Sequence, residues 1–300
     1  IKKSMDLLKP ALVILIDFPD FNLNIVAPAA KKRGIPVFYY ISPQVWAWRK
    51  GRVKQIKKLI DSMAVILPFE VDFYASYGYT VQYVGHALAD QVKSSFTPQA
   101  ARGEFGLAEA APTIGLLPGS RSAEVSRLLP EMIKAARIIS ARMPEAQYII
   151  PLADTLRQES VRGLIAGAGI DVKIVSGRIY DVLAACDLAI VTSGTATLEA
   201  GLIGVPMVIV YKMSVLSALI GKLIINPEFI GLVNIIAGKS VAPELIQLNA
   251  TGRRIASEAL GILLDSDRKL KMIHELKNIR EKLGEPGAAR KAAQIACNMI

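Results

Sequence analysis

Short apolar runs alternate with helical segments along this chain. The runs occupy 11–16, 37–41, 64–67 and 81–84 in the first third, then 113–117, 147–150, 172–175, 188–191 and 207–211. Continuous apolar runs of this length are typical of strands buried on both faces of a parallel sheet. Segments such as 24–32 and 52–60 have helical spacing, and the first is stopped by Gly34 and Pro36. The alternation predicts an α/β fold built on doubly wound parallel sheets.

A polar, Ala- and Pro-rich stretch at 92–112 interrupts this alternation and has the composition of an interdomain linker. We therefore predict an N-terminal α/β domain over 1–105 and a C-terminal α/β domain over 106–300, closed by helices at 253–283 and 287–300. The chain opens at Ile1, inside a helix-like segment that leads straight into a strand. We expect the beginning of the first domain to be missing from this sequence.

The clearest site signal lies at 181–211, where a βαβ unit carries a turn of small residues. Ser193, Gly194, Thr195 and Ala196 follow the strand at 188–191 and open a helix, whose free N–H groups and dipole attract anions. Glu199 lies about one turn into that helix, where a carboxylate can accept hydrogen bonds from two ribose hydroxyls. This layout predicts a nucleotide-sugar site, and the alternative is a plain strand–helix junction with a solvated Glu.

A second glycine turn follows the strand at 113–117. Gly119, Ser120 and Arg121 stand at the start of a helix, and this combination suits a phosphate. The turn lacks the Gly-Lys-Ser/Thr pattern of a Walker loop. Further along, Glu244 and Gln247 are three residues apart, which predicts that they share one helix face.

The first domain has its own polar cluster, at the carboxyl end of the strand at 11–16. Asp17 is the first residue past the strand, where open α/β sheets hold ligands, and it is the better catalytic candidate. Asp20 and Asn22 follow, and one of them is expected to cap the next helix instead.

Two other features of this domain are open to either a functional or a structural interpretation. Both tryptophans, Trp46 and Trp48, lie in a predicted loop at 42–49 beside basic residues, where they could line a sugar groove or cover the core. His86 follows the strand at 81–84 and is either a ligand contact or a structural histidine.

The composition narrows the function classes. A net charge of +10 favours polyanionic partners, but an aromatic content of 6% without an RNA-type signature weakens nucleic acid as one of them. Two cysteines fit a reducing cytoplasm. No apolar run reaches about 18 residues, so no spanning helix is predicted, and no secretory signal is present. The apolar stretch at 213–237 indicates an acyl-binding, membrane-facing or dimer surface, or else ordinary core.

Several of these segments together resemble the lipid-A-disaccharide synthase family, a group of GT-B glycosyltransferases. The matching segments are 16–22, 42–49, 67–70, 84–86, 116–124, 192–199 and 234–238. The sequences SPQVWAWR (42–49) and LLPGSR (116–121) are the most specific of them. The family differs in starting earlier, with a Gly/Ser-rich loop, and in usually having Pro where this chain has Val233.

The resemblance implies two Rossmann-like domains facing a cleft, the first one incomplete. It implies an inverting transfer from UDP-2,3-diacylglucosamine to 2,3-diacylglucosamine 1-phosphate, giving lipid A disaccharide 1-phosphate and UDP. Asp17 would be the general base, Arg121 and the 193–196 backbone would stabilise the UDP phosphates, and Glu199 would hold the ribose. Lower-ranked candidates are, for the nucleotide, Asn234, Glu244 and Gln247, and for the acceptor, Asp20, Asn22, Trp46 and His86.

The resemblance also implies that the reaction needs no metal or other cofactor. It implies a cytoplasmic enzyme, peripheral on the inner leaflet of the cytoplasmic membrane, with a homodimer as a further prediction and no nucleic-acid partner. Two alternatives stay open at this point. One is another GT-B transferase or epimerase that uses UDP-N-acetylglucosamine, and the other is a non-catalytic nucleotide-binding protein.

Overall fold

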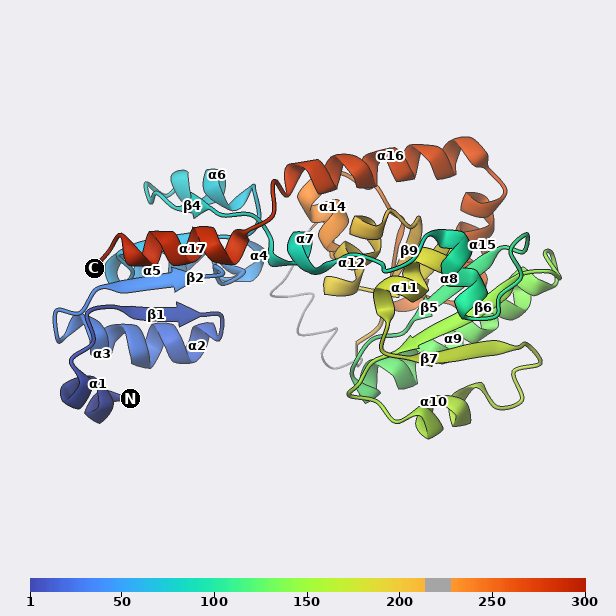
Figure 1. Cartoon of the computed structure of the whole chain (residues 1–300), viewed down its shortest axis with the longest axis horizontal. Helices are drawn as coiled ribbons and strands as arrows, with labels where there is room; N and C mark the ends of the chain where they lie inside the picture. The colour runs from blue at the N-terminus through green and yellow to red at the C-terminus, as the bar shows by residue number, and fades with distance from the viewer. Residues whose placement is uncertain (214–227) are drawn as a thin grey trace. The chain divides into compact units, whose positions relative to one another are not determined.

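The computed structural model describes residues 1–213 and 228–300. These residues divide into two compact units, one of 1–91 with 281–300 and one of 92–213 with 228–280. Each unit is built on one parallel sheet (Figure 1). The predicted α/β class with parallel sheets is therefore confirmed.

The sheet of the first unit has its strands in chain order, β1-β2-β3-β4. They are β1 (Val13–Ile16), β2 (Val37–Tyr40), β3 (Ser62–Val65) and β4 (Gln82–Tyr83). α1 (Lys2–Leu8) precedes β1, and α7 (Ala87–Gln91) follows β4. Between the strands lie α2 (Pro19–Phe21), the π-helical turn η1 (Asn22–Val26), α3 (Ala27–Lys31), α4 (Val45–Trp48), the 3-10 turn η2 (Lys50–Arg52), α5 (Val53–Leu59) and α6 (Glu70–Ala75).

The two faces of this sheet are covered by different parts of the chain. Because side chains alternate along a strand, Val37 and Tyr39 point into the larger core, which also contains residues of η1, α3 and α5. Phe38 points to the other face, where Ala292 and Ala296 of α17 (Ala288–Cys297) pack against it. The sequence analysis assigned 287–300 to the second domain. Its helical spacing predicted the helix, but only the packing decides which sheet the helix covers.

Two expectations about this unit were wrong in detail. The strand at 11–16 was predicted to be buried, but β1 is an edge strand in the described sheet, and Ile14 and Ile16 are 51% and 57% exposed. The segment at 42–49 was predicted to be a loop, but four of its residues form α4. An apolar run shows that a segment is hydrophobic, but it does not show how many strands lie beside that segment in the sheet.

The second unit has six described strands in the order β10-β9-β8-β5-β6-β7. They are β5 (Thr113–Leu117), β6 (Gln147–Leu152), β7 (Val172–Ser176), β8 (Leu188–Thr192), β9 (Met207–Tyr211) and β10 (Glu244–Ile246). Its helices are α8 (Pro98–Glu104), α9 (Ser122–Ser140), α10 (Gln158–Ile165), α11 (Ile179–Ala185), α12 (Thr195–Ile203), α14 (Leu232–Ala237), the 3-10 turn η3 (Gln247–Asn249), α15 (Gly252–Leu263) and α16 (Ser266–Lys282).

Strand order in this sheet reverses at β5, because the chain moves to β6 and β7 on one side and returns to β8 on the other. In open α/β sheets, ligands bind at the carboxyl ends of the strands at such a reversal. The β5–β8 pair, with Leu117 opposite Val191, is therefore where a ligand is expected.

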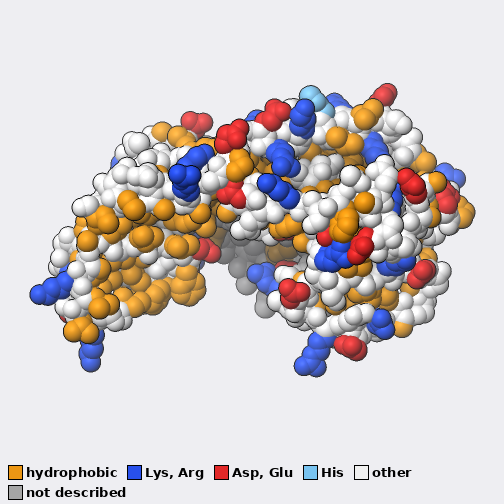
Figure 2. All heavy atoms as spheres, viewed as in Figure 1, with side chains coloured by type: hydrophobic (Ala, Val, Ile, Leu, Met, Phe, Trp, Pro, Cys, Tyr) orange, Lys and Arg blue, Asp and Glu red, His pale blue; other side chains and the backbone are white. Residues whose placement is uncertain are grey.

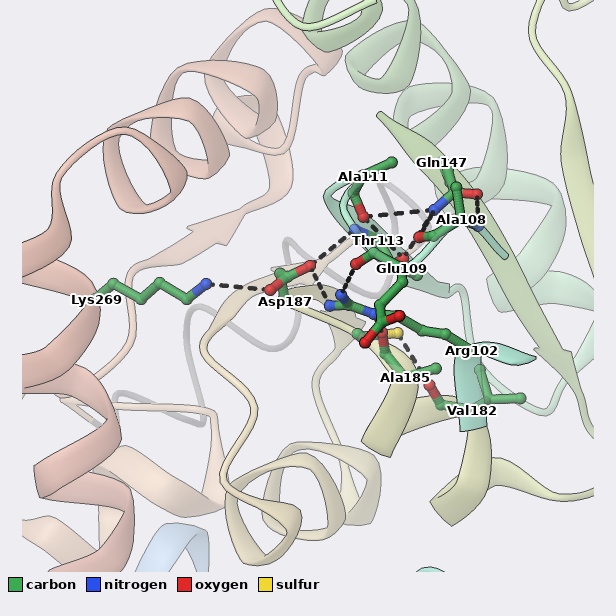
Figure 3. A network of polar contacts seen from close by, with 11 residues as sticks. Arg102, Ala108, Glu109, Ala111, Thr113, Gln147, Val182, Ala185, Asp187 and Lys269 are labelled. Atoms are coloured by element: carbon green, nitrogen blue, oxygen red, sulfur yellow. Dashed lines mark hydrogen bonds and ion pairs between the residues drawn. The ribbon is translucent and has the colours of Figure 1, made fainter. Parts of the chain in front are cut away.

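The amino ends of the same two strands are joined by a polar network around Asp187 (Figure 3). Its carboxylate accepts hydrogen bonds from Arg102 Nη2 at 2.7 Å, the Thr113 N–H at 3.0 Å and Lys269 Nζ at 3.3 Å. Arg102 belongs to α8 and Lys269 to α16, so one carboxylate holds two helices against the start of β5. This network stabilises the amino ends of the strands, and the ligand is expected at their carboxyl ends.

Three sequence predictions concern the second half of the chain. None of the described helices is long and apolar enough to cross a membrane. Much of the apolar stretch at 213–237 falls on 214–227, which lies outside the described residues. The prediction that Glu244 and Gln247 share a helix face is wrong, because Glu244 begins β10 and Gln247 begins η3. The spacing of three residues between Glu244 and Gln247 is compatible with a helix, but the segment that begins at Glu244 pairs with β9 as a strand.

Candidate functional site: a nucleotide-sugar site in the second unit

The two predicted phosphate loops lie side by side, because β5 and β8 are hydrogen-bonded neighbours. The loop after β5 carries Gly119, Ser120 and Arg121, and the loop after β8 carries Ser193 and Gly194. Helices α9 and α12 start from these two loops, at Ser122 and Thr195. Two helix N-termini and their loop N–H groups therefore lie at one edge of the sheet, where they attract an anion.

Gly119 is required by both its backbone and its surroundings. Its φ of +112° is unfavourable for residues with a side chain, and a Cβ built on it would lie 2.5 Å from Glu124 Oε2 and 3.3 Å from Thr192 Cγ2. The Thr192 hydroxyl is buried and has no hydrogen-bond partner within the described part of the chain. The close approach of Gly119 to Thr192 brings the two loops together.

Gly194 has a different role in the second loop. Its φ is +150°, and a Cβ built on it would meet nothing within 4 Å, so the space above it is open. The Thr197 hydroxyl donates to the Gly194 carbonyl at 2.8 Å, and the Ser193 hydroxyl donates to the Ile230 carbonyl at 2.8 Å. The loop is thus held by its own side chains, and the N–H groups of Thr195 and Ala196 form no hydrogen bond with another described residue.

Glu199 lies on α12, one turn after the loop, and it is half-buried. Tyr180 of α11 donates its hydroxyl hydrogen to Glu199 Oε1 at 3.2 Å. Burial raises the pKa of Glu199, and the hydrogen bond from Tyr180 opposes this shift. The sequence analysis missed Tyr180, because nothing in its local pattern indicates that α11 packs beside α12.

Two other nucleotide candidates are occupied by internal contacts. Glu244 accepts hydrogen bonds from the N–H groups of Ile230 and Gly231, both at 2.9 Å, and from Asn234 Nδ2 at 2.8 Å. Asn234 is fully buried, and its Oδ1 accepts from the N–H groups of Val241 and Ala242. Glu244 and Asn234 therefore anchor the segment around Ile230, whose carbonyl accepts the hydrogen bond from the Ser193 hydroxyl.

The remaining candidates of this unit lie at its surface. The Arg121 side chain is 81% exposed, and its Nη1 donates to Glu124 Oε1 at 3.0 Å. The Ser120 carbonyl accepts a hydrogen bond from the Thr155 hydroxyl at 2.6 Å, and the Ser120 side chain is exposed. Gln247 Oε1 accepts from the Met213 N–H at 3.3 Å.

In the first unit, the structure gives Asp17 an unusual backbone. Asp17 and Phe18 both have left-handed conformations, with φ of +47° and +45°. The Asp17 carbonyl accepts hydrogen bonds from the Tyr39 hydroxyl at 2.6 Å and from Asn22 Nδ2 at 2.7 Å. Left-handed backbone costs about 1–2 kcal/mol per residue outside glycine, and such strain gathers at functional sites. Asn22 is therefore a support for Asp17. The expectation that Asp20 or Asn22 caps the next helix was wrong, because neither side chain caps α2 or η1.

The other acceptor-side candidates have clear partners. Asp20 is exposed and forms ion pairs with Arg49, at 3.1 Å, and with Arg52. Trp46 packs edge-on against Phe69, with 5.0 Å between ring centroids. His86 is buried, its Nδ1 accepts from the Leu88 N–H at 3.1 Å, and burial lowers its pKa.

A buried carboxyl group, which the sequence analysis did not single out, lies next to the tryptophan segment. Glu70 is 1% exposed, and its Oε2 accepts from the Leu67 N–H at 3.0 Å. Burial raises the pKa of Glu70 to about 7, against the opposing effects of Leu67, Ser42 and Trp46. The Trp46 Nε1–H is buried and has no hydrogen-bond partner among the residues that the structure describes.

Among the described residues, no group of three or more His, Cys, Asp or Glu side chains is arranged to hold a metal ion. Two parallel-sheet units, with paired glycine loops at helix starts and a following acid in the second, are the arrangement of the GT-B class of nucleotide-sugar enzymes.

Comparison with known proteins agrees with this class. A family model described as lipid-A-disaccharide synthetase matches residues 1–299. Lipid-A-disaccharide synthase from Syntrophus aciditrophicus (strain SB) is 54% identical over 301 residues, which cover 100% of this chain and 78% of the relative. The chain belongs to the lipid-A-disaccharide synthetase family.

Solved structures show the same fold at low identity. UDP-GlcNAc 2-epimerase from Neisseria meningitidis, bound to UDP-GlcNAc, has a TM-score of 0.64 at 12% identity, covering 99% of this chain and 79% of its own. MurG from Acinetobacter baumannii has a TM-score of 0.61 at 15% identity, covering 99% of this chain and 76% of its own. The predicted GT-B fold and the predicted glycosyltransferase of lipid A biosynthesis are confirmed, and the two alternative functions are not favoured.

Proposed function

We propose that this chain transfers a diacylglucosaminyl group from UDP-2,3-diacylglucosamine to O6 of 2,3-diacylglucosamine 1-phosphate, with inversion. The new bond joins O6 of the acceptor to the anomeric carbon of the donor, and the bond from that carbon to the UDP oxygen breaks. The acceptor hydroxyl loses its proton, and UDP leaves with the bonding electrons. The observation that carries the proposal is the pair of anion-binding loops at the β5–β8 reversal, followed by Glu199.

On the donor side, the diphosphate would bind the N–H groups of the two loops. Thr195 and Ala196 open α12, and Ser120 and Arg121 precede α9, so both helix dipoles favour the charge that develops on departing UDP. Arg121 is exposed and can turn from Glu124 toward a diphosphate. Glu199 would accept hydrogen bonds from the ribose hydroxyls, with Tyr180 fixing its rotamer.

On the acceptor side, Asp17 would accept the proton from the 6-hydroxyl as the new bond forms. Its position at the carboxyl end of β1 and its strained, doubly held backbone support this role. Asn22 would act through Asp17, and Trp46 and His86 would act through packing, since their polar atoms contact the protein itself or lie buried. Asn234 and Glu244 would act in the same indirect way on the nucleotide loop.

The lipid partners fit the surface of the first unit. Figure 2 shows apolar side chains gathered on the unit that carries α1 and β1. Leu7, Leu8 and Phe18 are among its exposed large apolar residues. With a net charge of +10, such a surface suits peripheral binding to the anionic cytoplasmic leaflet. Flotation with anionic and neutral vesicles tests this, and sedimentation velocity tests the predicted homodimer.

The central experiment replaces the proposed base. In a transfer assay with both lipid substrates, Asp17→Asn is expected to lower kcat by about 10²- to 10⁴-fold, the usual contribution of a general base. The Kd for UDP, measured by calorimetry, is expected to stay at the wild-type value because the nucleotide loops belong to the other unit. Asp72→Asn, an exposed aspartate of α6 in the same unit, is the matched control.

A kcat for Asp17→Asn within a few-fold of the wild-type value would remove Asp17 from the mechanism. Binding of UDP-N-acetylglucosamine in preference to the diacylated donor would point to a different GT-B transferase or epimerase. An absence of UDP binding by the folded chain would remove the donor-site assignment.

A further inference from the structure

Two arginines of the first unit converge on one carboxylate oxygen. Arg49 Nη1 lies 3.1 Å from Asp20 Oδ1, and Arg52 Nη2 contacts the same oxygen. Their charges lower the pKa of Asp20, mainly through the hydrogen bond from Arg52. An oxyanion therefore fits between these two guanidinium groups, and guanidinium pairs are the side chains best suited to phosphate.

This cluster lies close to the proposed base. Asp20 follows Asp17 by three residues at the end of β1, and the arginines follow β2, which pairs with β1 up to Tyr40. Burial raises the pKa of Tyr39 to about 12, and the nearby charge of Arg52 is among the effects that oppose it. The Tyr39 hydroxyl in turn contacts the Asp17 carbonyl. Arg52 is thus linked to the Asp17 segment through its contact with Asp20, three residues further along the chain.

The cluster is open to solvent and carries surplus positive charge. The Asp20 side chain is 66% exposed and that of Arg49 is 41% exposed, whereas the Arg52 side chain is only 17% exposed. Lys50 lies between the two arginines in sequence and is also exposed. The Arg49 guanidinium stacks over Trp48, 4.1 Å from its ring centroid, which orients the guanidinium plane. One carboxylate is therefore paired with two arginines, and a further lysine lies next to them in the sequence.

We propose that Arg49 and Arg52 form the subsite for the 1-phosphate of the acceptor sugar, and that Asp20 holds them in place until the acceptor binds. This inference rests on the proposed function, which supplies an acceptor with a phosphate monoester. Asp20 stands on a three-residue helix at the surface, so its side chain can rotate away from the phosphate. A single sugar ring then extends from its 6-hydroxyl at Asp17 to its phosphate at the arginine pair.

The test compares two acceptors that differ only in the phosphate. The acceptors are 2,3-diacylglucosamine 1-phosphate and 2,3-diacylglucosamine, each assayed at saturating donor with the wild-type chain, Arg49→Gln and Arg52→Gln. With the phosphorylated acceptor, Arg52→Gln is expected to lower kcat/KM by roughly 10- to 100-fold, the loss of one charge-assisted contact. With the acceptor that lacks phosphate, both variants are expected to match the wild-type chain. In a separate series that varies the donor, the donor KM is expected to stay unchanged in both variants.

Arg33→Gln is the matched control. Arg33 also binds an exposed carboxylate, with its Nε and Nη2 at 2.6 and 2.8 Å from the two Asp6 oxygens. The Arg33→Gln variant is expected to match the wild-type rates with either acceptor. Arg52→Lys keeps the charge and is expected to recover part of the loss.

Equal losses with both acceptors would show that the arginines act on the fold, and would overturn the subsite. Wild-type rates with the phosphorylated acceptor in both variants would overturn it too. An absence of transfer by the wild-type chain with either acceptor would refute the proposed function itself and this subsite with it, which separates that failure from the other two.

Discussion

The hydroxyl of Tyr39 offers the sharpest test of how the fold prepares Asp17. Tyr39→Phe removes one oxygen atom from a fully buried side chain and leaves its ring in the core. The Asp17 carbonyl then loses its 2.6 Å hydrogen bond and keeps the one from Asn22 at 2.7 Å.

The magnitude follows from two opposing terms. Left-handed conformations at Asp17 and Phe18 cost about 1–2 kcal/mol each. The two hydrogen bonds to the Asp17 carbonyl contribute about 1 kcal/mol each. The strain of about 2–4 kcal/mol thus equals or exceeds the contribution of about 2 kcal/mol from the two hydrogen bonds, so the loss of one bond lets the segment relax in part of the population. Misplacing a catalytic group by about 1 Å costs up to about 100-fold in rate, so we expect kcat to fall by about tenfold.

The assay measures kcat and both KM values, together with urea unfolding. Tyr79→Phe is the control, because the Tyr79 hydroxyl also donates to a main-chain carbonyl in this unit, that of Ile60, at 3.0 Å. Both variants are expected to lose about 1 kcal/mol of unfolding free energy or less. Only Tyr39→Phe is expected to lower kcat, and the donor KM is expected to be unaffected in either variant.

Equal kcat values for the two variants would refute the reasoning, because the hydrogen bond would then contribute to stability alone. A lower kcat in Tyr79→Phe would refute it as well, since a general loss of packing would explain both.

Three further predictions concern the nucleotide site and the buried acid. Glu199→Gln removes the charge that accepts the ribose hydroxyls, so calorimetry is expected to show UDP binding weakened by about 10- to 100-fold; Glu159→Gln, on α10 of the same unit, is the control. Gly119→Ala places a Cβ 2.5 Å from Glu124 Oε2 at a φ of +112°, so thermal unfolding is expected to show a loss of about 1–3 kcal/mol, and an unchanged midpoint would contradict the close approach. Because burial raises the pKa of Glu70 to about 7 from 4.5, its contribution to stability is present below pH 4.5 and is lost as the pH rises through 7. The expected loss is up to about 3 kcal/mol, and Glu70→Gln is expected to remove this part of the pH dependence in urea unfolding, whereas parallel curves for variant and wild type would contradict it.

Local signals in the sequence predicted most elements and both glycine turns that open a helix. The apolar runs at 113–117 and 188–191 became β5 and β8 almost residue for residue. Gly119 and Gly194 could be recognised because only particular backbone conformations need glycine, and such needs are local. Errors arose where packing decides, as at Glu244, whose spacing from Gln247 indicated a helix but which pairs with β9.

The sequence by itself determined the α/β class, the family through its loop motifs, and the residues that carry the proposed chemistry. Tertiary structure alone decided that α17 covers the first sheet, that Tyr180 contacts Glu199, and that Tyr39 and Asn22 hold the Asp17 carbonyl. The physical reason is the distance along the chain over which each kind of interaction acts. Strand and turn propensities act between near neighbours in the chain, whereas these contacts join residues that are brought together only when helices pack and strands choose their order in the sheet.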